Sequence, residues 1–341
     1  MQSTDLHAFS PIHAVALRPK QNSEVAFGAV SASKSGLTTQ EVRDKSLAGV
    51  KDRQANRETG GRMKGKVGII TGVGPVAGIG TAAARIYARE GASHLYLLDF
   101  QGEQLPQLAA ELQQHYPTLK VTWTQGDAAS DEHIQKIIKQ AMEEEGRLDF
   151  FFANAGISIP KPKLKEGDDP AIAGLKGMAK GMSGTDAEDV FLAVKYASAA
   201  LARVNPAKGK TIPGGSLVLT ASVAGKLANA GPIPYSASKA AVISMAQTAA
   251  YELTGQNIRV NAICPGLIQT DMTKLAFDYA RATGKEHRMG TLNPLLRQGL
   301  PHEVAELAVW LSSDESSYVN GQALSVDGGL TGSMPYIRAK M

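Results

Sequence analysis

Tyr235 and Lys239 lie four residues apart in the segment Tyr-Ser-Ala-Ser-Lys, a spacing that places both side chains on one face of a helix. A phenol that titrates near its ordinary pKa of ~10 is a poor base at neutral pH, and a nearby ammonium group favours its ionised form. The pair therefore predicts a tyrosine that exchanges a proton with a substrate and a lysine that tunes it. The same spacing is frequent on helix surfaces, so the pair alone indicates little.

Ser222 strengthens this prediction. It follows the apolar run 217–219, which we expect to be a strand. Open α/β sheets bind ligands at the carboxyl ends of their strands, and a serine hydroxyl there can hold a carbonyl oxygen. Ser222, Tyr235 and Lys239 together predict chemistry at a carbonyl or a secondary alcohol.

A glycine-rich segment, Thr-Gly-Val-Gly-Pro-Val-Ala-Gly-Ile-Gly at 71–80, lies between an apolar run and an alanine-rich helical stretch. Glycines let the backbone turn sharply and approach a pyrophosphate, which the amides and dipole of the following helix N-terminus stabilise. This context predicts a dinucleotide-binding loop. The residues expected to bind the cofactor there are Gly72, Gly74, Gly78, Ile79 and Gly80.

Asp99 ends the next apolar run, 25 residues beyond Gly74. At this spacing a carboxylate can accept hydrogen bonds from both hydroxyls of the adenosine ribose. A 2′-phosphate would meet that negative charge, and the loop contains no arginine or lysine to receive it. The sequence therefore favours NAD over NADP.

The elements that must position these residues are short apolar runs separated by helical stretches. Parallel strands need crossover helices, so we expect an α/β fold: a Rossmann-type, doubly wound parallel sheet. The expected organisation is an N-terminal extension at 1–62, partly helical or disordered, a single dinucleotide-binding catalytic domain at 63–334 and a C-terminal tail at 335–341. The runs are 67–70, 95–98, 121–123, 148–152, 216–219, 258–263 and 323–326.

Composition limits the partners. A net charge of +4 over 341 residues, without a clustered basic face, indicates neither nucleic acid nor an anionic membrane. No apolar run approaches the ~18 to 20 residues that span a bilayer, and we expect a small-molecule partner. Cys264 is the single cysteine, so an intrachain disulfide is excluded. From its place in the segment 262–266 we expect it to have a buried packing role. No metal site is expected.

The combined pattern resembles the short-chain dehydrogenase/reductase family. The resemblance covers about residues 64–332, and its elements follow the order of the family. They are the glycine loop, Asp99, Asp127, Asn-Ala-Gly at 154–156, Ser222 thirteen residues before the Tyr235-x-x-x-Lys239 pair, Pro265-Gly266, Thr270 and Val-Asp-Gly-Gly at 326–329.

The resemblance implies roles for these residues. Tyr235 would be the proton donor or acceptor, Lys239 would also bind the nicotinamide ribose, and Ser222 would orient the substrate oxygen. Family members commonly assemble through the helices that begin here near positions 186 and 234, so a homodimer or homotetramer is expected. The remaining cofactor contacts implied are Asp127 to the adenine, Asn154 in the cofactor cleft, and Ile268 with Thr270 to the carboxamide.

Two departures from the family pattern matter. Five residues separate Gly72 from Gly78, where the family usually has three, so the cofactor loop is longer and both Gly72 and Gly74 are candidates for the first glycine. Asp186 falls where the family usually has a catalytic asparagine. This aspartate puts the usual asparagine–lysine water relay in doubt.

Two segments are candidates for the substrate side. Residues 157–184, with interspersed glycines, predict either a mobile lid or a surface insertion. The stretch 272–289 contains Leu275, Phe277 and Tyr279 and is a second candidate wall. Both hint at a mostly apolar substrate.

Alternatives stay open for function and location. A lyase or epimerase that uses NAD transiently is one alternative, and a nucleotide-binding regulator without catalysis, suggested by Asp186, is another. Cytoplasm is the default location in the absence of a secretory signal. The ending Ala-Lys-Met resembles a relaxed peroxisomal address, whereas the N-terminal stretch is sparsely basic for a mitochondrial presequence.

Overall fold

The computed structural model describes residues 61–156 and 186–332, together with the helical residues Asp44 and Ala48. The described chain forms one seven-stranded sheet of order β3-β2-β1-β4-β5-β6-β7. Every neighbouring pair of strands is parallel. The strands are β1 (Val67–Thr71), β2 (His94–Asp99), β3 (Lys120–Gln125), β4 (Phe150–Ala153), β5 (Gly215–Thr220), β6 (Ile258–Pro265) and β7 (Ala323–Val326).

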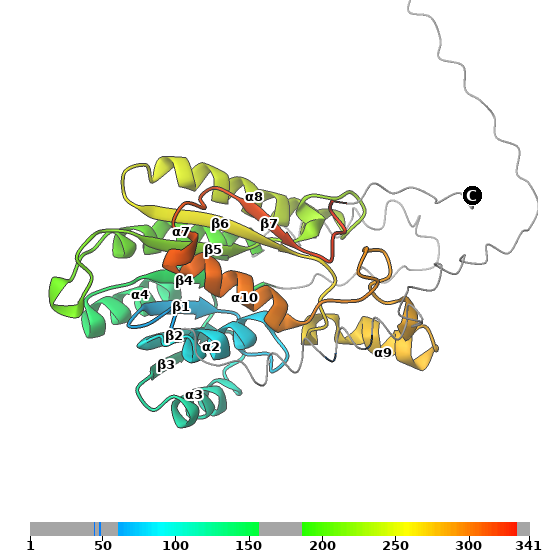
Figure 1. The fold of residues 1–341 in the computed structure, drawn as a ribbon, viewed down its shortest axis with the longest axis horizontal. Helices are drawn as coiled ribbons and strands as arrows, with labels where there is room; N and C mark the ends of the chain where they lie inside the picture. Colours follow the sequence, from blue (N-terminus) through cyan, green and yellow to red (C-terminus); the bar gives the residue numbers. More distant parts are fainter. Residues whose placement is uncertain (1–43, 45–47, 49–60, 157–185, 333–341) are drawn as a thin grey trace, which may run out of the picture.

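Helices cover both faces of the sheet (Figure 1). One buried cluster joins the sheet to α4, α7 and α8, and the other joins it to α2, α3 and α10. The expected doubly wound α/β fold is confirmed. The helices are α2 (Ile79–Arg89), α3 (Leu105–His115), α4 (Asp131–Glu145), α7 (Asp186–Leu201), α8 (Ile233–Glu252), α9 (Lys274–Ala282) and α10 (Pro301–Ser312).

The central strands are buried on both faces, which explains why they read as continuous apolar runs. All five residues of β1 and all four of β4 are buried. The Phe150 ring stacks on Tyr87 with centroids 4.3 Å apart. Cys264 in β6 is fully buried, and burial raises the pKa of its thiol, as expected for a packing role.

The sheet order changes direction between β1 and β4, because β1 leads outward to β2 and β3 whereas β4 leads outward to β5, β6 and β7. Loops that leave the carboxyl ends of β1 and β4 therefore turn to opposite sides and open a crevice between them. This crevice is where a ligand is expected in such a sheet.

The start of the described domain is held by ion pairs. Arg62 contacts Glu90 at 2.8 Å and Glu306 at 2.9 Å, and Arg89 contacts the same two carboxylates at 3.0 and 2.8 Å. The four charges join α2, α10 and the chain before β1. Within residues 61–156 and 186–332, no helix combines the length and apolarity needed to cross a bilayer.

Candidate active site

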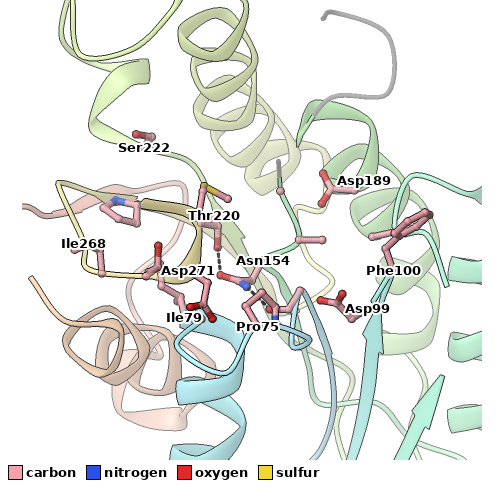
Figure 2. A pocket seen from close by; sticks show the side chains of 18 of the residues that line it. Pro75, Ile79, Asp99, Phe100, Asn154, Asp189, Thr220, Ser222, Ile268 and Asp271 are labelled. Carbon is pink, nitrogen blue, oxygen red and sulfur yellow. Dashed lines mark hydrogen bonds between the residues drawn. The ribbon is translucent and has the colours of Figure 1, made fainter. Parts of the chain in front are cut away.

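A cavity of about 540 Å³ lies at the carboxyl ends of the central strands. Its lining comes from segments far apart in the sequence: the glycine loop, the ends of β2 and β5, the Asn-Ala-Gly turn after β4, α7, α8 and the chain after β6. Figure 2 shows the side chains that converge there. The predicted residues that line it are Gly72, Gly78, Ile79, Asp99, Asp127, Asn154, Ser222, Tyr235, Lys239, Ile268 and Thr270.

The two candidate first glycines have different positions. Gly72 lines the cavity in a left-handed conformation, with φ of +75°, and a Cβ there would lie 2.8 Å from the backbone of Ala155. Gly74 lies against Asp99, and a Cβ there would lie 2.5 Å from the carboxylate. A side chain is therefore excluded at both positions. Ala155 would block it at Gly72, and the Asp99 carboxylate would block it at Gly74.

Asp99 is fixed by backbone amides. Its Oδ2 accepts from Gly74 N and its Oδ1 accepts from Gln101 N, both at 2.7 Å. A carboxylate has about four acceptor positions, so acceptor capacity remains toward the cavity. The exposed Phe100 lies beside it in the lining, where a flat aromatic surface is available to a ligand.

The charge of the cavity is mainly negative. Four aspartates contribute to the described lining, at positions 99, 127, 189 and 271, whereas Lys239 is the single cation of that described lining.

Gly80 packs behind Gly72, close enough that a Cβ there would lie 2.2 Å from the Gly72 carbonyl oxygen.

Asn154 joins the ends of three strands. Its backbone N–H and that of Ala155 donate to Thr71 Oγ1 at 3.0 Å. Its Nδ2 donates to the Gly72 carbonyl oxygen at 3.1 Å, and its Oδ1 accepts from the Thr220 hydroxyl at 3.3 Å (Figure 2). These bonds hold the floor of the cavity together.

Ser222, Tyr235 and Lys239 meet at the same cavity. Ser222 follows β5, and its Oγ accepts from Ala224 N at 3.1 Å, which caps the short helix η2 (Val223–Gly225). Lys239 is buried, and its Nζ donates to the Thr220 carbonyl oxygen at 2.9 Å. The same Nζ lies 5.7 Å from the ring centroid of the half-buried Tyr235. The structure thus brings the three predicted catalytic side chains to one site.

The segment after β6 forms another wall. Ile268 is buried and pairs with Gly299 in an isolated bridge, and Thr270 follows in the lining. Thr270 N donates to Thr273 Oγ1 at 3.0 Å. The hydroxyl of Thr273 donates in turn to the Ile268 carbonyl oxygen at 2.7 Å.

The substrate-side predictions have mixed outcomes. The proposed wall at 272–289 is correct at Met272, which lines the cavity. It is wrong at Phe277, which is 1% exposed because it packs into the protein interior. Leu275 and Tyr279 are exposed and are not among the residues that line the cavity. The segment 157–184, predicted to be either a lid or a surface insertion, lies outside the described residues.

Asp186 begins α7, but its side chain lies outside the described part of the structure. Asp189, one helical turn later, is 5% exposed and lines the cavity. Sequence reasoning missed Asp189, together with Phe100 and Asp271. The i, i+3 spacing from Asp186 is the signal that could have found Asp189, since such residues share a helix face.

No cluster of His, Cys, Asp or Glu within 61–156 and 186–332 has a geometry suited to a metal ion. The groups that converge are instead a glycine cradle, acceptors for hydroxyls, and a tyrosine with a neighbouring ammonium. These groups are of the kinds that a dinucleotide requires.

Comparisons with known proteins identify the family to which this fold and cavity belong. Residues 72–331 match a family model described as enoyl-(acyl carrier protein) reductase. A 3-oxoacyl-(acyl-carrier-protein) reductase of Thermotoga maritima is 36% identical over 271 residues, which cover 79% of this chain and 99% of the relative. The chain belongs to the short-chain dehydrogenase/reductase family.

Other short-chain dehydrogenases/reductases align over a similar range. The meso-2,3-butanediol dehydrogenase of Serratia marcescens is 30% identical over 272 residues, covering 80% of this chain and 97% of the relative. The crystal structure of levodione reductase superposes with a TM-score of 0.66 at 29% identity, covering 80% of this chain and 100% of that one. The protein is therefore an oxidoreductase that acts on alcohols or carbonyls, and its family uses NAD or NADP.

Proposed function

We propose that this protein transfers a hydride between NAD(H) and a carbonyl or secondary alcohol, with Ser222, Tyr235 and Lys239 as catalytic residues. The observation that carries the proposal is the convergence of these side chains with the glycine loop on one cavity. A bound nicotinamide supplies or accepts the hydride.

The side chains handle the proton. In the reducing direction the Tyr235 hydroxyl donates its proton to the substrate oxygen as the carbon receives the hydride, and in the oxidising direction the phenolate takes that proton back. Ser222 holds the same oxygen by a hydrogen bond. Lys239, with Nζ 5.7 Å from the Tyr235 ring, stabilises the phenolate and binds the nicotinamide ribose.

The cofactor residues are proposed from their positions. Gly72, Gly78 and Ile79 line the phosphate side, while Gly74 and Gly80 shape the loop behind them. Asp99 accepts the ribose hydroxyls, and Asp127 and Asn154 border the adenosine half. Ile268 and Thr270 face the carboxamide.

NAD is proposed over NADP because a 2′-phosphate beside Asp99 would meet a fixed carboxylate. The single cation of the described lining, Lys239, is hydrogen-bonded to the end of β5. Titration of the protein with NADH and NADPH, followed by nicotinamide fluorescence, tests this preference. Tighter binding of NADPH would refute it.

The substrate is proposed to be a mostly apolar small molecule. Pro265, Ile268 and Met272 provide apolar lining in the cavity that also holds Ser222 and Tyr235. Mixing the protein with NAD and a panel of secondary alcohols, and recording absorbance of the reduced nicotinamide, tests the reaction class. Cofactor binding without turnover on any alcohol or ketone would favour a regulator.

A homodimer or homotetramer is proposed from the outer faces of α7 and α8. Phe191 is 54% exposed and Tyr251 is 83% exposed, although large apolar side chains are normally buried. Light scattering at micromolar protein tests this assembly, and a monomeric mass would refute it.

We further propose a cytoplasmic enzyme whose catalytic domain spans 63–334, preceded by an extension and followed by a tail. Arg62, at this boundary, is already anchored to Glu90 and Glu306. Limited proteolysis tests the boundaries. Imaging of N-terminally tagged protein with and without its last three residues tests the location, because punctate signal lost on truncation would indicate peroxisomes.

A further inference from the structure

Asp271 links two walls of the cavity that are 194 residues apart in sequence. Its Oδ2 accepts a hydrogen bond from the backbone N–H of Ala77 at 3.0 Å. Ala77 belongs to the lengthened glycine loop, and Asp271 begins the short helix η3 (Asp271–Thr273) after β6. Figure 2 shows Asp271 on the side of the cavity formed by the glycine loop and Ile79.

The glycine loop is held at its base by short-range bonds. Gly78 N donates to the Pro75 carbonyl oxygen at 3.0 Å, and the Thr81 hydroxyl donates to the carbonyl oxygens of Val73 and Pro75 at 2.8 and 2.7 Å. Val76, at the tip, is exposed. The contact of Ala77 with Asp271 therefore connects the outer part of the loop to a different region of the fold.

The other end of the link is firmly placed. Thr273 holds both Thr270 and Ile268 through its hydroxyl, and Gln269 N donates to the Gly299 carbonyl oxygen at 2.9 Å. Asp271 lies inside this small bonded unit. A loop fastened to Asp271 is thus fastened to the wall that carries Ile268 and Thr270.

We propose that Asp271 is a positioning residue that closes the lengthened glycine loop over the bound dinucleotide and slows its release. Pro75 and Gly78 of the loop line the cavity together with Asp271 and Thr273, so a ligand that fills it contacts both of the segments that this hydrogen bond joins. The inference rests on the dinucleotide site proposed above. It assigns a function to the two residues by which this loop exceeds the usual family length.

The test is the dissociation rate of the reduced dinucleotide, which needs no substrate. The full chain is loaded with NADH, or with NADPH if that binds more tightly, and release is followed by fluorescence after a chase with excess oxidised nucleotide. Loss of one hydrogen bond is typically worth about 0.5 to 1.5 kcal/mol, so Asp271→Ala should release the nucleotide about 2- to 10-fold faster. Asp271→Asn should stay near the wild-type rate, because its amide oxygen still accepts from Ala77.

Asp278→Ala is the matched control, since it removes an aspartate of α9 that pairs with Lys274 and Arg281 outside the cavity lining. It should leave the rate unchanged. Deletion of Val76 and Ala77 restores the usual loop length. In that background Asp271→Ala should no longer change the rate of nucleotide release.

Three results would overturn the inference. They are an unchanged rate in Asp271→Ala, an equal acceleration in Asp271→Ala and Asp271→Asn, or slower release in both, which would mean that the carboxylate charge repels the pyrophosphate. If the wild-type protein binds neither nucleotide, the proposed cofactor site itself fails. If the wild-type protein binds a nucleotide and Asp271→Ala releases it at the wild-type rate, only the role of Asp271 is refuted.

Discussion

The Nζ of Lys239 lies 5.7 Å from the ring centroid of Tyr235 and donates to the Thr220 carbonyl oxygen at 2.9 Å. The ammonium is therefore held between the end of β5 and the phenol. This arrangement places a fixed positive charge beside the group that must exchange a proton.

Replacement of Tyr235 by phenylalanine deletes only the hydroxyl. Turnover should fall by about 10²- to 10⁴-fold, the usual contribution of a general acid or base, while NADH affinity stays near the wild-type value. Steady-state rates and fluorescence titration on one preparation check both parts. Retained turnover would contradict the assignment of Tyr235.

Replacement of Lys239 by alanine should lower both turnover and NADH affinity, because the ammonium serves the phenol and the ribose. Lys226→Ala is a matched control, since Lys226 donates to Ser325 and lies outside the described cavity lining. An unchanged NADH titration in Lys239→Ala would reject the ribose contact and leave the role in proton transfer to the kinetic measurement.

Asp99→Asn should relax discrimination against NADP by about tenfold or more, since like charges in contact cost several kcal/mol. The amide oxygen can still accept from Gly74 N, which keeps the loop bond, whereas the amide nitrogen cannot accept from Gln101 N. Asp99→Ala removes both the charge and the acceptors for Gly74 and Gln101, and should weaken NADH binding as well. The ratio of NADPH to NADH affinity is the measurement, and a ratio equal to wild type in both variants would refute the prediction.

Glu90 should contribute stability that depends on pH. Burial acts to raise its pKa, but hydrogen bonds from Arg62 and Arg89 outweigh burial and lower it to about 2, from an ordinary value of 4.5. A carboxyl with a lowered pKa stabilises the fold above its ordinary pKa and loses that contribution as pH falls toward the folded value.

Glu90→Gln should therefore cost about 1 to 3 kcal/mol of unfolding free energy at pH 7, the range for a buried group that loses a charged hydrogen-bond partner. The difference from wild type should narrow as pH is lowered from 4.5 toward 2. Urea unfolding at several pH values measures it. A constant difference across this window would mean that the charge of Glu90 is not responsible.

The positions of the strands could be predicted from the sequence, because strands buried on both faces must be apolar along their whole length. Val67–Ile70 in β1 and the run 216–219 in β5 are examples in which the apolar run and the buried strand nearly coincide. Local spacing also located Tyr235 with Lys239 on one helix and the glycines before α2, since helical periodicity and backbone conformation act over a few residues.

Tertiary structure alone decided the contacts between distant loops. The bond from Ala77 to Asp271 and the choice of the α9 face that buries Phe277 depend on how segments after different strands pack at the sheet edge. An irregular loop carries no periodic signal. The direction in which its side chains point follows from its neighbours in space, so a residue such as Asp271 becomes part of the site only when the chain has folded.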